Sequence, residues 1–338
     1  MPVANRNTSS AHYPWVDVLK FVCCVGVVAV HARPFEYLPA VRVCVGHFFT
    51  AFIAVFFILS ALLLGTKLRF DATGKPVLLK FCKRLAVLYL SWTVLLAPLW
   101  VYTLMSHYPD DWLRLLLPKI LLTGAPSGSW FILSLLYGTV IAYCCNRWLG
   151  KWPTLVLAVL VDVYYVGLHF RIFEDFLHIG IEYKIFNSFF LPMRALLWVD
   201  IGLLAGQRLG KIQTAVRRRL PVAVSVALAA SLLTAFAPSR VVTLLAAGVL
   251  SVALVALAVG CPAGRRVNPA ACALLRKQSI LIYFFHFAMV FLLNAVCERL
   301  HTYPYGLRGF AIVLAASWVF SYAVVKLSPE IKPLRLLY

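Results

Sequence analysis

Apolar runs of about 20 residues, almost free of charge, recur along the chain from residue 15 to residue 326. Runs of this length suit α-helices that cross the roughly 30 Å hydrocarbon core of a bilayer. The fifth and sixth runs are the least regular, because Asp162, Arg194 and Asp200 interrupt them. The pattern predicts an all-α, polytopic transmembrane helix bundle of about ten spans, at residues 15–35, 44–65, 85–105, 130–148, 152–169, 190–208, 220–237, 241–259, 279–297 and 309–326.

The connections between these runs are short, which leaves no room for a sizeable soluble domain. Residues 110–122 have the pattern of an amphipathic segment lying at the membrane surface. We therefore expect a cytoplasmic N-terminal tail at 1–14, one transmembrane domain at 15–327 and a cytoplasmic C-terminal tail at 328–338.

The distribution of lysine and arginine predicts the orientation. With a cytoplasmic N-terminus, the inside segments hold 21 of these residues and the outside loops hold 9. Cytoplasmic loops of membrane proteins carry such an excess of positive charge. Both termini are therefore predicted to be cytoplasmic.

Composition agrees with a membrane protein. Of the 338 residues, 62% are hydrophobic and 13% are charged, whereas soluble domains have about 25% charged residues. The formal net charge of +20 is largely this topology signal, so no nucleic-acid partner is expected, although part of it can attract an anionic cytosolic ligand. The nine cysteines show no metal-binding spacing, and no metal is expected.

Three ionisable residues, Asp17, Lys20 and His31, lie in or beside the first span. Charges inside a membrane are costly and usually face the bundle interior at a functional site. Lys20 and His31 are eleven residues apart, so they return to within about 20° of one helix face, about 16 Å apart along the axis. Alternatively, Lys20 reaches the headgroups with Asp17 as its salt-bridge partner, and His31 is an ordinary interfacial histidine.

These residues resemble the opening motif of the membrane acyltransferase-3 family, a basic residue and a histidine separated by ten intervening residues. That family usually has arginine at the first position, where this chain has Lys20. Other segments resemble the family in the same order along nearly the whole chain: Phe56-Phe57-Ile58-Leu59-Ser60, Lys83-Arg84 with Tyr89 and Trp92, Ser129-Trp130-Phe131-Ile132-Leu133, and Ser279-Ile280-Leu281-Ile282-Tyr283-Phe284-Phe285-His286. The chain has no room for the SGNH domain that some members carry.

The resemblance implies transfer of an acyl group, most often acetyl, from cytoplasmic acyl-CoA to a hydroxyl of a cell-envelope glycan or lipid-linked sugar. Histidine titrates near neutrality, so His31 is the candidate general base, oriented by a group from another helix. Lys20, Lys83 and Arg84 are candidates to bind the CoA phosphates, although Lys83 and Arg84 also fit ordinary positive-inside anchoring. The pantetheine arm, about 16–20 Å long when extended, matches the separation from Lys20 to His31.

Five further residues are weaker candidates. Ser279 and Tyr283 share a face of the ninth span with His286, which is either a second catalytic or positioning residue or a packing histidine. Trp130 either lines an acyl channel or belongs to the interfacial aromatic belt. Arg194 either contacts an anionic acceptor or has a structural partner.

Two other functions remain open from the sequence. A transporter or flippase for a glycan or an acylated solute also needs polar groups in the membrane, but no base. A structural or sensory subunit would not need the ionisable stripe of the first span. The resemblance favours an O-acyltransferase of the bacterial inner membrane, with membrane lipid, acyl-CoA and a carbohydrate as partners, and it leaves homo-oligomerisation open.

Overall fold

The computed structural model describes residues 13–126, 128–169, 195–237, 239–261 and 268–338, and this part of the chain is helical throughout, with no strand. Its main helices are α1 (Pro14–Ala32), α2 (Pro39–Gly65), α3 (Lys75–Leu95), α4 (Ala97–His107), α5 (Trp112–Pro118), α6 (Trp130–Trp148), α7 (Lys151–His169), α10 (Leu196–Gln207), α11 (Leu209–Arg218), α12 (Leu220–Phe236), α13 (Arg240–Gly260), α14 (Pro269–Arg299) and α15 (Leu307–Leu327). Short helical turns follow α2 (η1, Ala72–Gly74), α5 (η2, Lys119–Thr123) and α15 (η4, Lys332–Leu337).

The prediction of an all-α membrane protein is confirmed. Among the described residues, α1, α2, α13, α14 and α15 are each long and apolar enough to cross a bilayer, and two bent helix pairs raise this number to seven. Each predicted apolar run overlaps at least one helix, although the run 85–105 is divided between α3 and α4 and the described part of the run 190–208 forms the 12-residue helix α10. The full count of ten spans and the side of each terminus stay predictions.

The third predicted span, 85–105, is not one continuous helix. α3 and α4 meet at Leu96 with a bend of 68°. Pro98 lies in the first turn of α4, and a proline cannot donate the backbone hydrogen bond that would continue α3. The Trp100 indole donates instead to the Thr93 carbonyl at 2.9 Å, which satisfies an acceptor at the broken end of α3.

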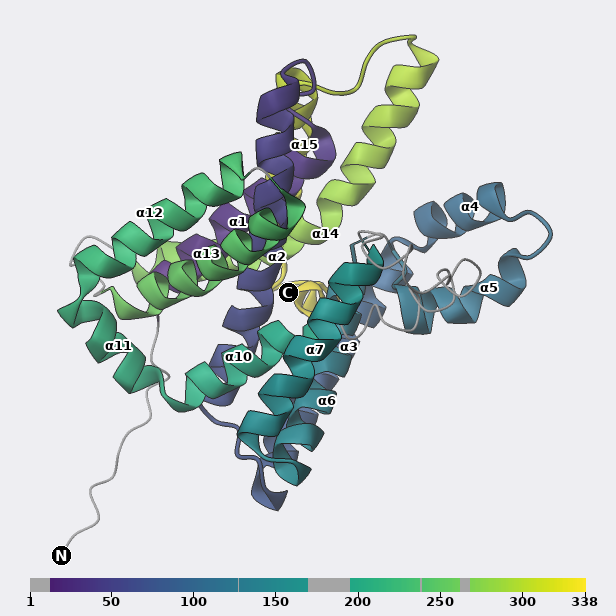
Figure 1. Ribbon diagram of the computed structural model, residues 1–338. Helices are drawn as coiled ribbons and strands as arrows, with labels where there is room; N and C mark the ends of the chain where they lie inside the picture. The colour runs from purple at the N-terminus through teal and green to yellow at the C-terminus, as the bar shows by residue number, and fades with distance from the viewer. Residues whose placement is uncertain (1–12, 127, 170–194, 238, 262–267) are drawn as a thin grey trace, which may run out of the picture.

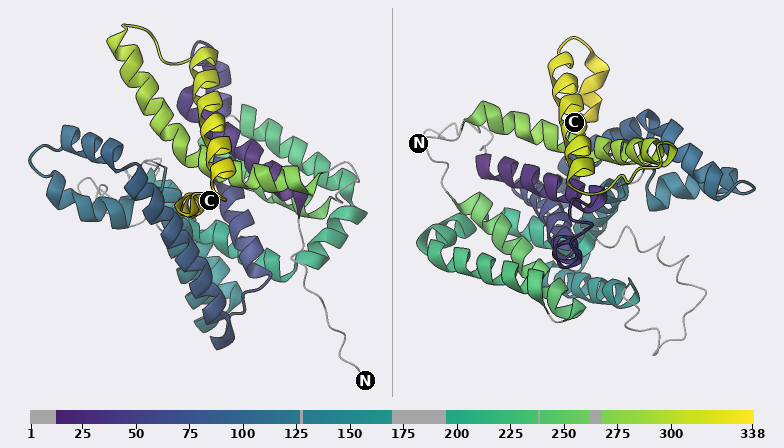
Figure 2. Two further views of the ribbon diagram at one scale, coloured as in Figure 1. Left: turned by 180° about the vertical axis from the view of Figure 1, so that it is seen from behind. Right: turned by 90° about the horizontal axis from the view of Figure 1, so that it is seen from above.

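The helices form two packed groups (Figure 1). One group contains α1, α2, α13, α14 and α15, and the other contains α3, α6 and α7. α10 joins them, because it packs against α2 as well as against α6 and α7. α4 and α5 extend to one side of the second group (Figures 1 and 2).

The segment after α15 folds back on the outside of the bundle (Figure 2), where η4 contacts both α3 and α15. Leu337 is buried there, and its carbonyl accepts a hydrogen bond from the Trp92 indole at 3.1 Å. Residues 328–338 therefore form an ordered wall beside α3.

Candidate functional site

The face of α1 that carries Asp17 and His31 packs along α14. Asp17, which is buried, has its carboxylate 3.7 Å from the guanidinium of Arg276. One heptad later, the thiol of Cys24 donates to the carbonyl of Ser279 at 3.2 Å. A further heptad brings His31 to α14, so the two helices run side by side and parallel. The predicted topology likewise sends the first and ninth spans across the membrane in the same direction.

A pair of histidines lies at the far end of this stripe. The ring centroids of His31 and His286 are 5.5 Å apart, and Phe287 contacts both rings, at 4.6 Å from His31 and 4.1 Å from His286. Phe49 of α2 packs edge-on against His31 at 5.9 Å. The orienting contacts that sequence could not assign to His31 thus come from α14 and α2, and they are aromatic packing contacts.

His286 is fully buried. Its Nδ1 lies 3.1 Å from the Ile282 carbonyl, one turn earlier in α14. Within the described part of the chain, its Nε2 has no hydrogen-bond partner. When Nδ1–H donates to that carbonyl, Nε2 carries the free lone pair. A buried polar atom without a partner is unusual and marks a site where a ligand or water can bind.

Tyr283 connects the histidine pair to the rest of the bundle. Its ring lies 6.0 Å from that of His286, and its hydroxyl donates to the carbonyl of Gly128 at 3.0 Å. Gly128 has a positive φ of 83°, and an added Cβ would come within 2.1 Å of the Phe287 ring. Glycine is thus needed at this turn, which precedes α6 and packs against Phe287.

A cavity of about 400 Å³, which we name the central cavity, lies where α1, α2, α3, α6 and α14 meet. None of the described residues that line it is acidic. Five are basic and come from four parts of the chain: Lys20, Lys67, Lys80, Arg84 and Arg276. Lys20 is electrostatically coupled to Arg84 and Arg276 as well as to Asp17. The cavity is therefore suited to the anionic end of a ligand.

The remaining wall of the central cavity is mainly apolar and aromatic. The rings of Phe56, Phe131 and Tyr283 contact one another, with centroids 5.7–6.0 Å apart, and all three line the cavity. His31 and His286 do not line it. Tyr283 lines the cavity, and its ring also contacts His286 one helical turn later, so Tyr283 lies between the cavity and the histidine pair.

The structure brings together most of the predicted site residues. Lys20, Arg84, Ser279 and Tyr283 line the central cavity. Lys83 is exposed and lines a neighbouring cavity instead. Trp130, at the start of α6, is not among the lining residues of either cavity. The prediction for Arg194 lies outside the described residues.

Three cavity-lining cations were not predicted as site residues: Lys67, Lys80 and Arg276. All three lie in segments interpreted as cytoplasmic loops, where basic residues are explained by topology alone. Arg276 comes three residues before Ser279 and so lies on the same helix face. The early start of α14, at Pro269, is what places Arg276 inside a helix.

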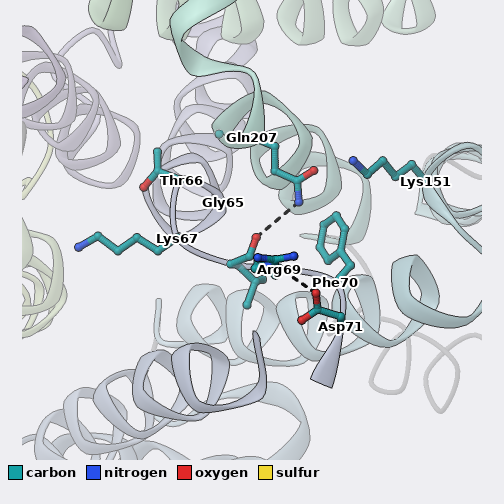
Figure 3. Close-up of a pocket in the computed structure, with 10 residues that line it drawn as sticks. Gly65, Thr66, Lys67, Arg69, Phe70, Asp71, Lys151 and Gln207 are labelled. Atoms are coloured by element: carbon teal, nitrogen blue, oxygen red, sulfur yellow. Dashed lines mark hydrogen bonds and ion pairs between the residues drawn. The ribbon is translucent and has the colours of Figure 1, made fainter. Parts of the chain in front are cut away.

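A second hollow, of about 490 Å³, lies at the connection between α2 and α3 (Figure 3). The ammonium group of Lys67 points away from the hollow, whereas that of Lys151 points toward it, and Gln207 donates to the Leu68 carbonyl at 3.5 Å (Figure 3). The hydroxyl of Thr73 donates to Asp71, which lowers the pKa of this carboxyl, and Arg69 at 3.1 Å adds to the effect. These contacts close the loop and position the start of α3.

Comparison with known proteins bears on the same residues. The model of a family described as an acyltransferase domain matches residues 13–322, which covers nearly the whole chain. The chain belongs to the acyltransferase-3 family. Neither a curated protein nor a solved structure gives a significant match. The resemblance inferred from the motifs is thus confirmed, and family membership together with the apolar helices indicates a multi-pass membrane acyltransferase.

Proposed function

We propose that this acyltransferase-3 protein transfers an acyl group, most simply acetyl, from cytoplasmic acyl-CoA to a hydroxyl of a cell-envelope glycan or lipid-linked sugar. In this proposal the protein lies in a bacterial inner membrane, with ten spans and both termini in the cytoplasm. His31 is the general base, and the central cavity binds the donor.

One observation carries the proposal: the central cavity is lined both by five cations and by Tyr283, and the Tyr283 ring contacts His286, which in turn contacts His31. Coenzyme A is a ligand with the same polarity, because its phosphates lie at one end and its thioester at the other. Lys20 and Arg84 would bind phosphate, since ammonium and guanidinium groups form strong charge-assisted hydrogen bonds to it. The apolar wall would hold the pantetheine arm.

The proposed reaction needs a base close to the acceptor hydroxyl. A ring nitrogen of His31 takes the hydroxyl proton as the oxygen bonds to the thioester carbonyl carbon. The tetrahedral intermediate then collapses, the carbon–sulfur bond breaks, and the proton passes from His31 to the CoA thiolate. His286 positions His31 through their ring contact at 5.5 Å, and its unpartnered Nε2 is available to a substrate or water.

Productive binding requires the thioester to pass Tyr283. Its side chain lines the cavity and contacts His286, and its hydroxyl donates to the Gly128 carbonyl. A change of Tyr283 rotamer is the smallest movement that would join the cavity to the histidine pair. The acyl group could then reach an acceptor on the opposite side of the membrane, while the nucleotide stays on the cytoplasmic side.

The test uses the purified protein in lipid nanodiscs. Acetyl-CoA binding is measured by calorimetry, and thioester cleavage is measured by thiol release. We expect saturable binding and slow hydrolysis in the wild type. His31→Gln should lower turnover by about 10²–10⁴-fold, the usual contribution of a general base, with the Kd for CoA changed by less than about twofold.

His47→Gln is the matched control, because His47 is a partly buried histidine of α2 that bonds the distant Thr234 carbonyl at 3.1 Å. It should keep wild-type turnover. Undiminished turnover in His31→Gln would refute the base assignment. A transporter would bind no acetyl-CoA and cleave no thioester, and mass spectrometry of glycans from cells with and without the gene would then show no lost acyl group.

A further inference from the structure

A second cationic cavity, of about 390 Å³, lies beside the central cavity between α3 and the C-terminal segment. We name it the C-terminal cavity. Its charged lining residues are Lys80, Lys83, Arg84 and Arg335. The first three lie within five residues on α3, and Arg335 faces them from η4. Arg335 lies beyond residue 322, where the family match ends.

Backbone hydrogen bonds hold Arg335 in place. Its Nε donates to the Ser328 carbonyl at 2.9 Å, and its Nη2 donates to the Pro329 carbonyl at 3.3 Å. The Ser328 hydroxyl in turn bonds the hydroxyl of Tyr338 at 2.7 Å. Together with the Trp92 indole bond to the Leu337 carbonyl, these contacts fix the segment that carries Arg335.

The charge of this cavity is not neutralised by the protein. No acidic side chain lines it, and within the described ranges none of its four cations forms an ion pair. The partners of the Arg335 guanidinium are neutral carbonyls. Four positive groups around one hollow attract a compact, multiply charged anion, and phosphate is the anion whose oxygens match guanidinium geometry.

The two cavities are neighbours, because Lys80, Arg84 and Leu88 line both. One ligand can therefore place its chain in the central cavity and its charged end in the C-terminal cavity. We propose that the C-terminal cavity is the site for the 3′-phosphate of the donor nucleotide, with Arg335 and Lys83 as the binding residues that distinguish CoA from its dephosphorylated form. This inference rests on the proposed function and assigns a specificity role to the C-terminal segment.

A phospholipid headgroup has the same phosphate chemistry and is the competing source. The shared lining residues favour the nucleotide. A lipid headgroup would need only the C-terminal cavity, whereas CoA would also use the central cavity, which is lined by Tyr283. The two sources predict different responses to lipid composition, so one experiment can separate them.

The experiment compares the Kd values of CoA and 3′-dephospho-CoA by calorimetry in nanodiscs of phosphatidylcholine. We expect the wild type to bind CoA about 10–100-fold more tightly, which corresponds to charge-assisted hydrogen bonds to one phosphate. Arg335→Gln should reduce this ratio at least fivefold and leave dephospho-CoA binding within twofold. Lys332→Gln, an exposed change in the same η4 turn and outside both cavities, should keep the ratio.

Two further variants guard against a local folding defect. Lys83→Gln removes a cation of the C-terminal cavity without touching η4, and it should also lower the ratio. Arg335→Lys keeps the charge and should restore part of it. Equal Kd values for both nucleotides in the wild type would overturn this inference and leave the proposed function intact, whereas no CoA binding at all would overturn the proposed function.

The lipid outcome is tested by adding phosphatidylglycerol to the nanodiscs. If the cavity binds the nucleotide phosphate, the CoA preference persists and Arg335→Gln retains as much phospholipid as the wild type in native mass spectrometry. A preference abolished by phosphatidylglycerol, together with less retained lipid in Arg335→Gln, would assign the cavity to a headgroup and overturn the proposal.

Discussion

Replacement of Gly206 by alanine tests how α10 packs against α2. A Cβ at Gly206 would lie 2.3 Å from the Leu62 carbonyl oxygen and 2.8–2.9 Å from backbone carbons of Gly65. Gly202, one turn earlier, has the same problem, with the Ile58 carbonyl oxygen at 2.5 Å. Small residues four apart let two membrane helices approach backbone to backbone. At these positions the obstacle is backbone, which cannot rotate away as a side chain can.

The loss of stability expected for Gly206→Ala follows from these short distances. A carbon–oxygen contact needs about 3.3 Å, so the two helices must separate by about 1 Å to admit the Gly206→Ala methyl group. Overpacking of this kind costs about 1–3 kcal/mol, and alanine returns up to about 1 kcal/mol of helix propensity. We expect a net destabilisation of about 1–2 kcal/mol.

Gly210→Ala is the matched control four residues later, because no heavy atom lies within 4 Å of its Cβ position. At that position the substitution changes only helix propensity, which is higher for alanine than for glycine, so the stability of the protein should stay equal or rise. Reversible unfolding in detergent, followed by circular dichroism, measures both variants. Equal stability of Gly206→Ala and Gly210→Ala would refute the close approach of α10 to α2.

Two smaller predictions concern local contacts. Trp92→Phe keeps an aromatic ring against Phe284 but removes the indole donor to the Leu337 carbonyl; it should cost about 1 kcal/mol and speed hydrogen exchange in residues 328–338, and unchanged exchange would contradict it. Thr73→Val removes the hydrogen bond that lowers the pKa of Asp71, so that pKa should rise toward its ordinary value in a carbon-13 NMR titration. At pH values above its ordinary pKa, the ionised Asp71 carboxylate stabilises its loop, and this stabilisation is lost as the pH falls through the lowered pKa of the folded protein. The Thr73→Val variant should therefore lose the stabilisation at a higher pH than the wild type. An unchanged Asp71 titration would count against the Thr73 bond.

The helices were predictable because their signal is local. A membrane span needs about 20 apolar residues in sequence, and each such run overlaps at least one helix among the described residues. The bend at Leu96 was missed, although Pro98 lay within the predicted span. A proline breaks a hydrogen bond in any helix, but the direction of the following segment depends on what it packs against. Here the Trp100 bond to Thr93 contributes to the outcome.

Part of the site was also readable along one helix. Asp17 and His31 were placed on one stripe by helical period, and both face α14. The partner of Asp17 was not predictable in the same way. Lys20, the partner expected within α1, interacts electrostatically with the carboxylate, but the carboxylate also lies 3.7 Å from the guanidinium of Arg276, a residue more than 250 positions away.

The sequence by itself thus determined that the chain lies in a membrane, where its helices lie, its family and the candidate histidine of the first span. Hydropathy, helical period and motif order can all be read along the chain. Only the tertiary structure decided that His31 meets His286, that Lys67 and Arg276 join Lys20 around one cavity, and that Arg335 faces α3. These are contacts between segments far apart in the chain. They depend on how apolar helices with similar surfaces pack together, and no periodic pattern in one helix specifies its neighbour.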